Sequence, residues 1–228
     1  MIYEDLRERL TRGEIPFARK LIEQQLAADF QTSRTPVREA LRRLEGDGHL
    51  TRDPSGGMRP RVPSVSGMRD LYDVRIAIED LIVRRASSSG DRGALEGLQQ
   101  EWLELSAEHR RGWLADAGVA FVRRDESFHE RLADSTANEF ALKVLRDINA
   151  RIRILRIHDF TTSERIGATI GEHLEIIRAI LAGEAETAAG FMRAHVERSA
   201  NVVRERIGDA LTRMFEAGET RGTTPRSR

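Results

Sequence analysis

The stretch Ser33–Leu50, SRTPVREALRRLEGDGHL, decides how the N-terminal part of the chain folds. Arginines recur in it at intervals of four residues, at Arg34, Arg38 and Arg42. Apolar residues alternate with them, at Val37, Leu41 and Leu44. On an α-helix the two sets occupy opposite faces, so one face packs on a small core and the other is cationic. Such a helix suits the major groove of DNA, where arginine donates two hydrogen bonds to guanine or grips phosphates. The alternative is an amphipathic helix whose charged face is only solvated.

The residues around this stretch predict a winged helix-turn-helix domain. Two short amphipathic segments precede it, at residues 3–12 and 20–29, and Ser33 or Thr35 is expected to cap the third helix. The stretch at residues 53–63, DPSGGMRPRVP, combines residues that tolerate positive φ with stiffening prolines, which predicts a hairpin and a linker. We therefore assign residues 1–63 to this domain.

The remainder of the chain has helical periodicity and no alternating strand pattern. We expect helices near residues 66–88, 92–111, 113–135, 138–158, 163–182 and 185–214. Residues 64–214 thus predict an all-α antiparallel bundle, and the fold class is mostly α. Residues 215–228 are polar and predict a disordered tail.

Composition excludes several classes of protein. The chain has 228 residues, a formal net charge of zero and no cysteine, so a metal site would have to use His, Asp or Glu. It lacks the run of roughly 20 apolar residues that a membrane helix needs, so we expect a cytoplasmic protein with no membrane partner. Residues 31–62 contain seven arginines and four acids, which concentrates a charge of +3 on that short segment.

Four potential metal ligands lie in the helical part: Asp125, His129, His173 and His195. Asp125 and His129 are four residues apart and share a helical face, while both other histidines lie beside apolar positions and are expected to point inward. One carboxylate and three imidazoles would suit a divalent Zn, Ni, Mn or Fe ion, with one or two positions open for water or a carboxylate. The alternative is that each histidine is a hydrogen-bonded core residue.

Arg75 shares a helical face with apolar residues, at Leu71, Ile78 and Ile82. A buried guanidinium needs an anionic partner, because an unpaired buried charge is costly. That partner is either a bound carboxylate or a nearby Asp or Glu. Asn149, on a facing helix, is a second candidate for an effector pocket.

The stretch Ser33–Leu50 resembles the recognition helix and following turn of the GntR superfamily of bacterial regulators, and residues 20–30 (KLIEQQLAADF) resemble its second helix. From the arginine face and this resemblance, the residues assigned to DNA contact are Ser33, Arg34, Thr35, Arg38, Arg42 and the wing-tip Gly57. Gln31 departs from the pattern, since the family usually has glycine in this left-handed turn, and the strain is on the order of 1 kcal/mol.

The pattern DESFH at Asp125–His129, followed by His173 and His195, resembles the FCD effector domain of the FadR-type branch of that superfamily. In part of this branch, one Asp and three His bind a divalent metal that helps to hold an organic acid. The resemblance implies a homodimeric transcription regulator whose affinity for double-stranded operator DNA is controlled by a small carboxylate. We expect a repressor of a catabolic operon, and the alternative is an activator. Arg75 and Asn149 would contact that carboxylate.

Two other functions would also account for part of the sequence. A metal-dependent hydrolase or isomerase would use the same four residues to activate water. However, Glu126 and Glu172 are turned roughly 100° from the ligand face, and an enzyme has no need of an arginine helix and a Gly-rich wing. A purely structural helical adaptor leaves three inward histidines unexplained. We therefore expect a regulator and no enzyme activity.

Overall fold

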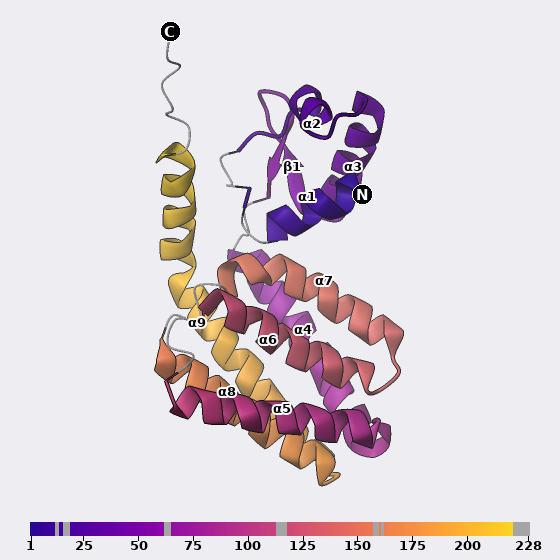
Figure 1. Cartoon of the computed structure of the whole chain (residues 1–228), viewed down its shortest axis with the longest axis vertical. Coiled ribbons are helices and arrows are strands. Elements are labelled where there is room, and N and C mark those ends of the chain that lie inside the picture. The colour runs from indigo at the N-terminus through magenta and orange to yellow at the C-terminus, as the bar shows by residue number, and fades with distance from the viewer. Residues whose placement is uncertain are drawn as a thin grey trace. The chain divides into compact units, whose positions relative to one another are not determined.

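The computed structural model describes residues 1–11, 14–15, 19–61, 65–112, 118–156, 160 and 162–220. It divides into two units, Met1–Ser64 with Ile207–Arg228, and Val65–Arg206. The described residues are mainly helical, with one small sheet in the first unit (Figure 1). The predicted fold class, a winged helix-turn-helix followed by an all-α bundle, is confirmed.

The first unit has the element order of a winged helix-turn-helix: α1 (Ile2–Thr11), α2 (Glu23–Asp29), α3 (Arg34–Gly46), β1 (Leu50–Arg52) and β2 (Met58–Pro60). Ser33 is the N-cap of α3, with extended backbone but no side-chain cap hydrogen bond. Gln31 has φ of 51°, the left-handed conformation expected at this turn. Helix α2 begins later than the expected residue 20, because Leu21 pairs with Met58 of the wing instead of entering the helix.

One apolar core holds this unit together. It draws buried side chains from the helices, the segment before α2 and the first wing strand: Leu6, Leu10, Ile15, Leu21, Leu26, Ala27, Val37, Leu41, Leu44 and Leu50. The apolar face predicted for α3 supplies three of them. Burial of that face fixes the rotation of α3, so its arginine face points to solvent.

The second unit is built from α4 (Val65–Ser89), α5 (Arg92–Arg110), α6 (Gly118–Asp134), α7 (Glu139–Arg156), α8 (Ser163–Leu181) and the first part of α9. Helix α9 runs from Ala185 to Thr220, and its residues up to Arg206 belong to this unit. These bounds lie within a few residues of those expected, and positions 113–117 and 157–158 lie outside the described residues. Helix α9 continues through 215–220, part of the segment expected to be disordered. Positions 221–228 lie outside the described residues.

The helices of the bundle pack around a shared interior. Helix α5 packs on α8, α6 packs on α7, and α4 contacts α6, α7 and α8 (Figure 1). Trp102 of α5 is buried there and meets Phe128 of α6 edge to face, with ring centroids 5.1 Å apart. Within the described part of the chain, no helix is both long and apolar enough to cross a membrane.

Candidate metal centre and DNA-binding surface

Helix α3 presents the cationic face that its sequence predicts. The side chains of Ser33, Arg34, Thr35, Arg38 and Arg42 are all exposed. Because the opposite face is buried in the core, these side chains are free to approach a partner as a group. The face therefore has the charge and the accessibility that groove insertion requires.

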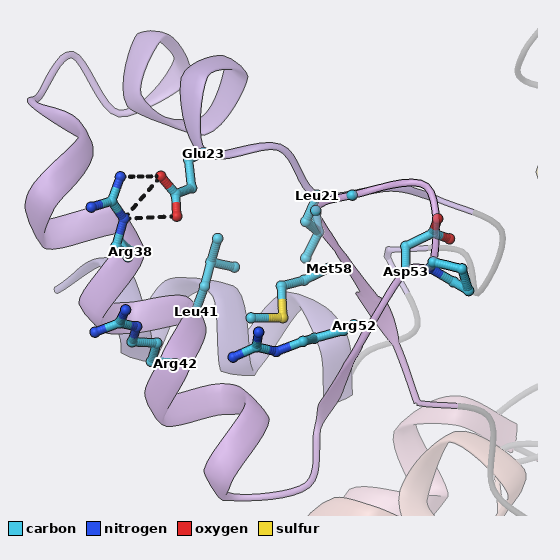
Figure 2. Close-up of a pocket in the computed structure, with 11 residues that line it drawn as sticks. Leu21, Glu23, Arg38, Leu41, Arg42, Arg52, Asp53 and Met58 are labelled. Atoms are coloured by element: carbon cyan, nitrogen blue, oxygen red, sulfur yellow. Dashed lines mark hydrogen bonds and ion pairs between the residues drawn. The ribbon is translucent and has the colours of Figure 1, made fainter.

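Arg38 is held in place by Glu23 of α2, a residue that the sequence analysis missed. Arg38 Nε and Nη2 donate to the two carboxylate oxygens of Glu23 at distances of 2.9 Å (Figure 2). The guanidinium hydrogen bond lowers the pKa of the Glu23 carboxyl. Arg42 and Arg52 face the same open hollow of about 420 Å³, which lies between the helices and the wing (Figure 2). The third helix and the wing thus line one hollow, in which Arg38, Arg42 and Arg52 lie beside Glu23 and Asp53.

The wing is fastened to the segment before α2. Leu21 and Met58 exchange two backbone hydrogen bonds, of 2.7 and 3.0 Å. Lys20 Nζ donates to the carbonyl oxygen of Ser55 at 2.8 Å, across the hairpin. Gly57 has φ of 85°, and a Cβ atom there would lie 2.9 Å from the carbonyl oxygen of Leu21. Glycine is therefore required at the wing tip for both its conformation and its close approach.

The four predicted ligands come together in the interior of the bundle. Asp125 and His129 project from α6, His173 from α8 and His195 from α9, and all four are buried. One ligand atom from each residue lies within 4.8 Å of the others. The Nε2 atom of His195 lies 3.2 Å from that of His129 and 3.3 Å from that of His173. The carboxylate of Asp125 lies 3.6 Å from His173 Nε2 and 3.7 Å from His129 Nε2.

These separations fit a single divalent cation. Nitrogen ligands at 2.0–2.1 Å from one tetrahedral ion stand roughly 3.3 Å apart, which agrees with the distances between the imidazoles. Nitrogen lone pairs at that distance repel one another unless a cation or a proton lies between them. The residues present therefore suit a metal such as Zn, Ni, Mn or Fe.

Two glutamates set which ring nitrogen carries the proton. Glu79 of α4 is hydrogen-bonded to His129 Nδ1, and Glu172 of α8 to His195 Nδ1 at 2.6 Å. A carboxylate accepts a hydrogen bond, so each Nδ1 carries the proton and each Nε2 lone pair faces the other ligands. Both imidazoles are thus oriented for metal binding before any ion arrives.

His173 is fixed by aromatic packing instead. Its ring stacks on Phe128 with centroids 3.9 Å apart and planes 5° apart, and it meets Trp102 edge to face at 4.3 Å. Among the described residues, its Nδ1 atom has no hydrogen-bond partner. Burial, together with the neighbouring His195, lowers the pKa of His173 well below its ordinary value, so the ring stays neutral and able to bind a metal.

Asp125 is kept ionised by a buried arginine. Burial alone would raise the pKa of Asp125, but the guanidinium of Arg156 holds it well below its usual range. Arg156 Nη2 donates to Asp125 Oδ2 at 2.6 Å. The other oxygen, Oδ1, accepts no hydrogen bond from the described residues, so it is available to a metal.

Arg75 and Asn149, the predicted effector residues, are both fully buried. The Nε atom of Arg75 donates to Glu79 at 2.6 Å, so the structural ion pair foreseen as one alternative is present. Its two terminal nitrogens, Nη1 and Nη2, have no hydrogen-bond partner in the described part of the chain. Both amide atoms of Asn149 are likewise unsatisfied by any described residue. Buried groups of this kind cost about 1–3 kcal/mol each when left unpaired, so they point to a polar ligand.

Sequence reasoning missed the residues that support the ligands: Glu79, Arg156 and Glu172. Glu79 follows Arg75 by one helical turn on the same face, a spacing that would have indicated the pair. Glu172 is adjacent to His173 and was expected to turn away from the ligands, and it does turn from His173. It contacts His195 on the neighbouring helix, on the ring nitrogen that points away from the cluster. It therefore orients a ligand and is badly placed to act as a base beside a metal-bound water.

Comparisons with known proteins agree with this architecture. The family model described as bacterial regulatory proteins of the gntR family matches residues 1–59, and that of the FCD domain matches residues 70–198. The Nta operon transcriptional regulator of Aminobacter aminovorans is 33% identical over 196 residues, 86% of this chain and 90% of that protein. The HTH-type transcriptional repressor RspR of Escherichia coli (strain K12) is 25% identical over 204 residues, 90% of this chain and 88% of that protein. The solved structure titled E. coli McbR/YncC covers 90% of this chain and 96% of its own, with a TM-score of 0.72 at 18% identity, and shares the fold.

Proposed function

The chain belongs to the gntR family of bacterial regulatory proteins and carries an FCD domain, and on this premise we propose a homodimeric, metal-containing repressor that responds to a small carboxylate. Family membership makes the chain a DNA-binding transcription regulator and not an enzyme. Repression of a catabolic operon is favoured by two relatives, a probable repressor of a D-xylose utilization operon and a repressor of a gluconate operon. Action on chromosomal DNA favours a cytoplasmic location.

The metal would be held by Asp125, His129, His173 and His195. Support comes from the convergence of three imidazole Nε2 atoms and one carboxylate in a fully buried cluster. The hydrogen bonds to Glu79 and Glu172 favour the tautomers that direct Nε2 lone pairs inward. When bound, a divalent ion supplies a positive charge with open positions to which a carboxylate can coordinate.

The observation that carries the effector proposal is the unpaired end of Arg75. Its two terminal nitrogens form a fork that matches a carboxylate, and no described residue satisfies them. Asn149, equally buried, offers both an amide donor and an acceptor to the same ligand, such as a hydroxyl or a second carboxylate.

Charge balance favours an anionic effector as well. In the chain alone, the buried cations Arg75 and Arg156 are balanced by the buried anions Glu79 and Asp125, while the third buried anion, Glu126, is paired with Arg153. A divalent ion adds two positive charges to this interior, where unbalanced charge is costly. A dicarboxylate, or a monocarboxylate with a bound hydroxide, would restore neutrality. We therefore expect the effector to be an organic acid.

DNA recognition would use the exposed face of α3 and the wing. Arg34, Arg38 and Arg42 supply donors for bases and phosphates, with Ser33 and Thr35 as shorter donors at the start of the helix. The tip at Gly57 would approach the minor groove. Binding of this kind depends on salt, since each neutralised phosphate releases counterions.

A homodimer would allow two recognition helices to read a near-palindromic operator. Helices α4 and α7, which pack on each other, both carry exposed apolar side chains: Val74, Leu81, Phe140 and Val144. Phe140 is 84% exposed, which is unusual for a large aromatic residue unless a partner covers it. We assign these four residues, called the α4/α7 apolar residues below, to the dimer contact.

The experiment that tests the proposal is a titration of purified protein onto the DNA that flanks its own gene, with and without a panel of organic acids. Metal content is determined on the same preparation by mass spectrometry. We expect about one divalent ion per chain, a specific complex with DNA, and release of that complex by one class of acid. Specific DNA binding that no acid alters, or the absence of bound metal, would contradict the effector and metal parts of the proposal.

A further inference from the structure

Glu79 is hydrogen-bonded both to a candidate metal ligand, His129, and to a candidate effector residue, Arg75. Its Oε1 accepts from Arg75 Nε at 2.6 Å, and its Oε2 is hydrogen-bonded to His129 Nδ1. Arg75, Glu79 and His129 are at most 1% exposed. A single carboxylate therefore joins the two halves of the site in a continuous chain of charge-assisted hydrogen bonds.

Glu172 plays a similar part for His195 but is connected differently. It is hydrogen-bonded to His195 Nδ1, and its second oxygen accepts from Arg198, whose side chain is 49% exposed. Its side chain is itself 13% exposed. The two glutamates thus orient equivalent atoms of two ligands, but only Glu79 leads to Arg75. Glu172 is a matched control within the same site.

We propose that Glu79 is a positioning residue through which an anion bound to Arg75 affects His129. By offsetting the charge of Arg75, the anion would strengthen metal binding at His129, and the metal would strengthen binding of the anion. This inference rests on the proposed metal and effector functions and deepens them, because it names the residue that couples the two ligands. Coupling between binding sites is reciprocal, so the metal would raise the affinity for the anion by the same factor.

The direction of the effect follows from electrostatics in a buried site. With its Nη atoms unoccupied, Arg75 draws the negative charge of Glu79 toward itself. An anion on those nitrogens offsets the guanidinium charge, so that Glu79 accepts more strongly from His129 Nδ1–H. A stronger acceptor at Nδ1 makes Nε2 more basic and a better metal ligand. Because the three residues are buried away from water, these charges are poorly screened.

Substitution of Glu79 by glutamine breaks the connection while keeping its size. If the amide oxygen continues to accept from Arg75, the amide NH₂ faces His129 Nδ1 and favours the tautomer with the proton on Nε2. That tautomer has no lone pair to offer the metal. If the amide is reversed, its NH₂ meets the Arg75 Nε–H donor. Either orientation removes the path between the two residues.

The test is a double-mutant cycle on the affinity for Zn²⁺ alone, measured by chelator competition. Arg75→Gln removes the guanidinium charge, as an anion would offset it, and is made in the wild type, in Glu79→Gln and in Glu172→Gln. We expect Arg75→Gln to tighten Zn²⁺ binding by about fivefold or more in the wild type and in Glu172→Gln, which is at the low end of ordinary coupling between sites. In the Glu79→Gln background, Arg75→Gln should change the logarithm of the Zn²⁺ affinity by less than about half as much as in the wild type.

An equal effect of Arg75→Gln in all three backgrounds overturns the inference, as does no effect in the wild type. Wild-type protein that binds no Zn²⁺ overturns the proposed function itself, so the two failures are distinguishable. If Arg75→Gln does not fold by circular dichroism, Arg75→Lys keeps the buried charge pair. Nitrogen NMR of the histidines in zinc-free protein then decides: the Nδ1–H signal of His129 should move and that of His195 should not. Equal movement of both, or of neither, contradicts the role of Glu79.

Discussion

Arg38 and Glu23 form a two-pronged ion pair across the turn between α2 and α3, with Arg38 Nε and Nη2 each 2.9 Å from a carboxylate oxygen. The pair is partly solvated, since the Arg38 side chain is 51% exposed and that of Glu23 is 35% exposed. Exposed pairs contribute little to stability. The arrangement instead restricts one long side chain on the surface proposed to read DNA, which lowers the entropy lost when a base is bound.

Arg38→Ala should abolish specific operator binding without unfolding the protein. Loss of one arginine that donates two hydrogen bonds to a base costs about 1–3 kcal/mol of binding free energy, and the proposed dimer loses it at both half-sites. Fluorescence anisotropy on operator DNA measures the loss, and circular dichroism confirms the fold. Arg9→Ala is the matched control, because Arg9 is a comparably exposed arginine of α1 in an ion pair with Asp5. Unchanged operator affinity in Arg38→Ala would remove this residue from the reading surface.

Glu23→Gln should separate specificity from affinity. Without its carboxylate, Arg38 loses its anchor, so discrimination between operator and random DNA should fall severalfold. Affinity for random DNA should rise, because a negative charge is removed from a surface that faces phosphates. Competition titrations with both DNAs at two salt concentrations measure the two effects. If specificity and non-specific binding both stay as in the wild type, Glu23 does not position Arg38 for reading.

Gly57→Ala should lower the stability of the winged domain, and Gly56→Ala should lower it less. Both glycines have positive φ, 91° at Gly56 and 85° at Gly57, so alanine costs about 1 kcal/mol at either position. At Gly57 the added Cβ would also lie 2.9 Å from the Leu21 carbonyl oxygen, while at Gly56 no described atom lies within 4 Å. The pair of backbone hydrogen bonds between Leu21 and Met58 would have to shift. Urea unfolding should rank Gly57→Ala as the less stable, and equal stability of the two variants would show that the contact is not tight.

His195→Ala should remove the response to the effector and spare basal DNA binding. Loss of one of four ligands should lower metal affinity by more than about 100-fold, the upper end of what changes to outer hydrogen-bond partners cause. The acid that releases wild-type protein from DNA should then no longer do so. Chelator competition and operator titration are the two measurements. A variant that keeps both its metal and its acid response would exclude His195 from the centre.

The candidate metal ligands could be predicted from the sequence, but the residues that orient them could not. Asp125 and His129 share a helical face, and that relation depends only on their spacing along α6. Glu172, in contrast, contacts His195 on another helix, so its role depends on how α8 and α9 are rotated against each other. No periodicity encodes that rotation. For the same reason α2 was expected to begin at residue 20, since the pairing of Leu21 with Met58 is a contact between distant segments.

The metal-free protein should lose stability as the pH falls below neutrality. Burial lowers the pKa of His129 and of His173, so both rings stay neutral in the folded state when the unfolded chain takes up protons near pH 6.5. The unfolded state then binds more protons, and the free energy of unfolding decreases by at most about 1.4 kcal/mol per pH unit for each ring. Glu79, whose pKa is lowered to about 2, changes the free energy of unfolding only at pH values below those at which the histidines titrate. Urea unfolding of chelated protein between about pH 7.5 and about pH 5.5 measures the slope. A flat profile would mean that the rings accept protons as readily as in the unfolded chain.

Phe140→Asp should convert the proposed dimer to monomers. A charge at this position, 84% exposed in the single chain, would be buried without a partner if the α4/α7 apolar residues meet across a two-fold axis. The cost would be incurred twice, once from each protomer, so a single substitution should raise the dissociation constant by orders of magnitude. Size-exclusion chromatography with light scattering gives the mass, and operator affinity should fall with it because two half-sites are no longer read together. Phe191→Asp is the control, since Phe191 of α9 is also exposed, at 39%, but lies outside the α4/α7 apolar residues. If Phe191→Asp dissociates the protein and Phe140→Asp does not, the dimer contact is formed by another face of the bundle.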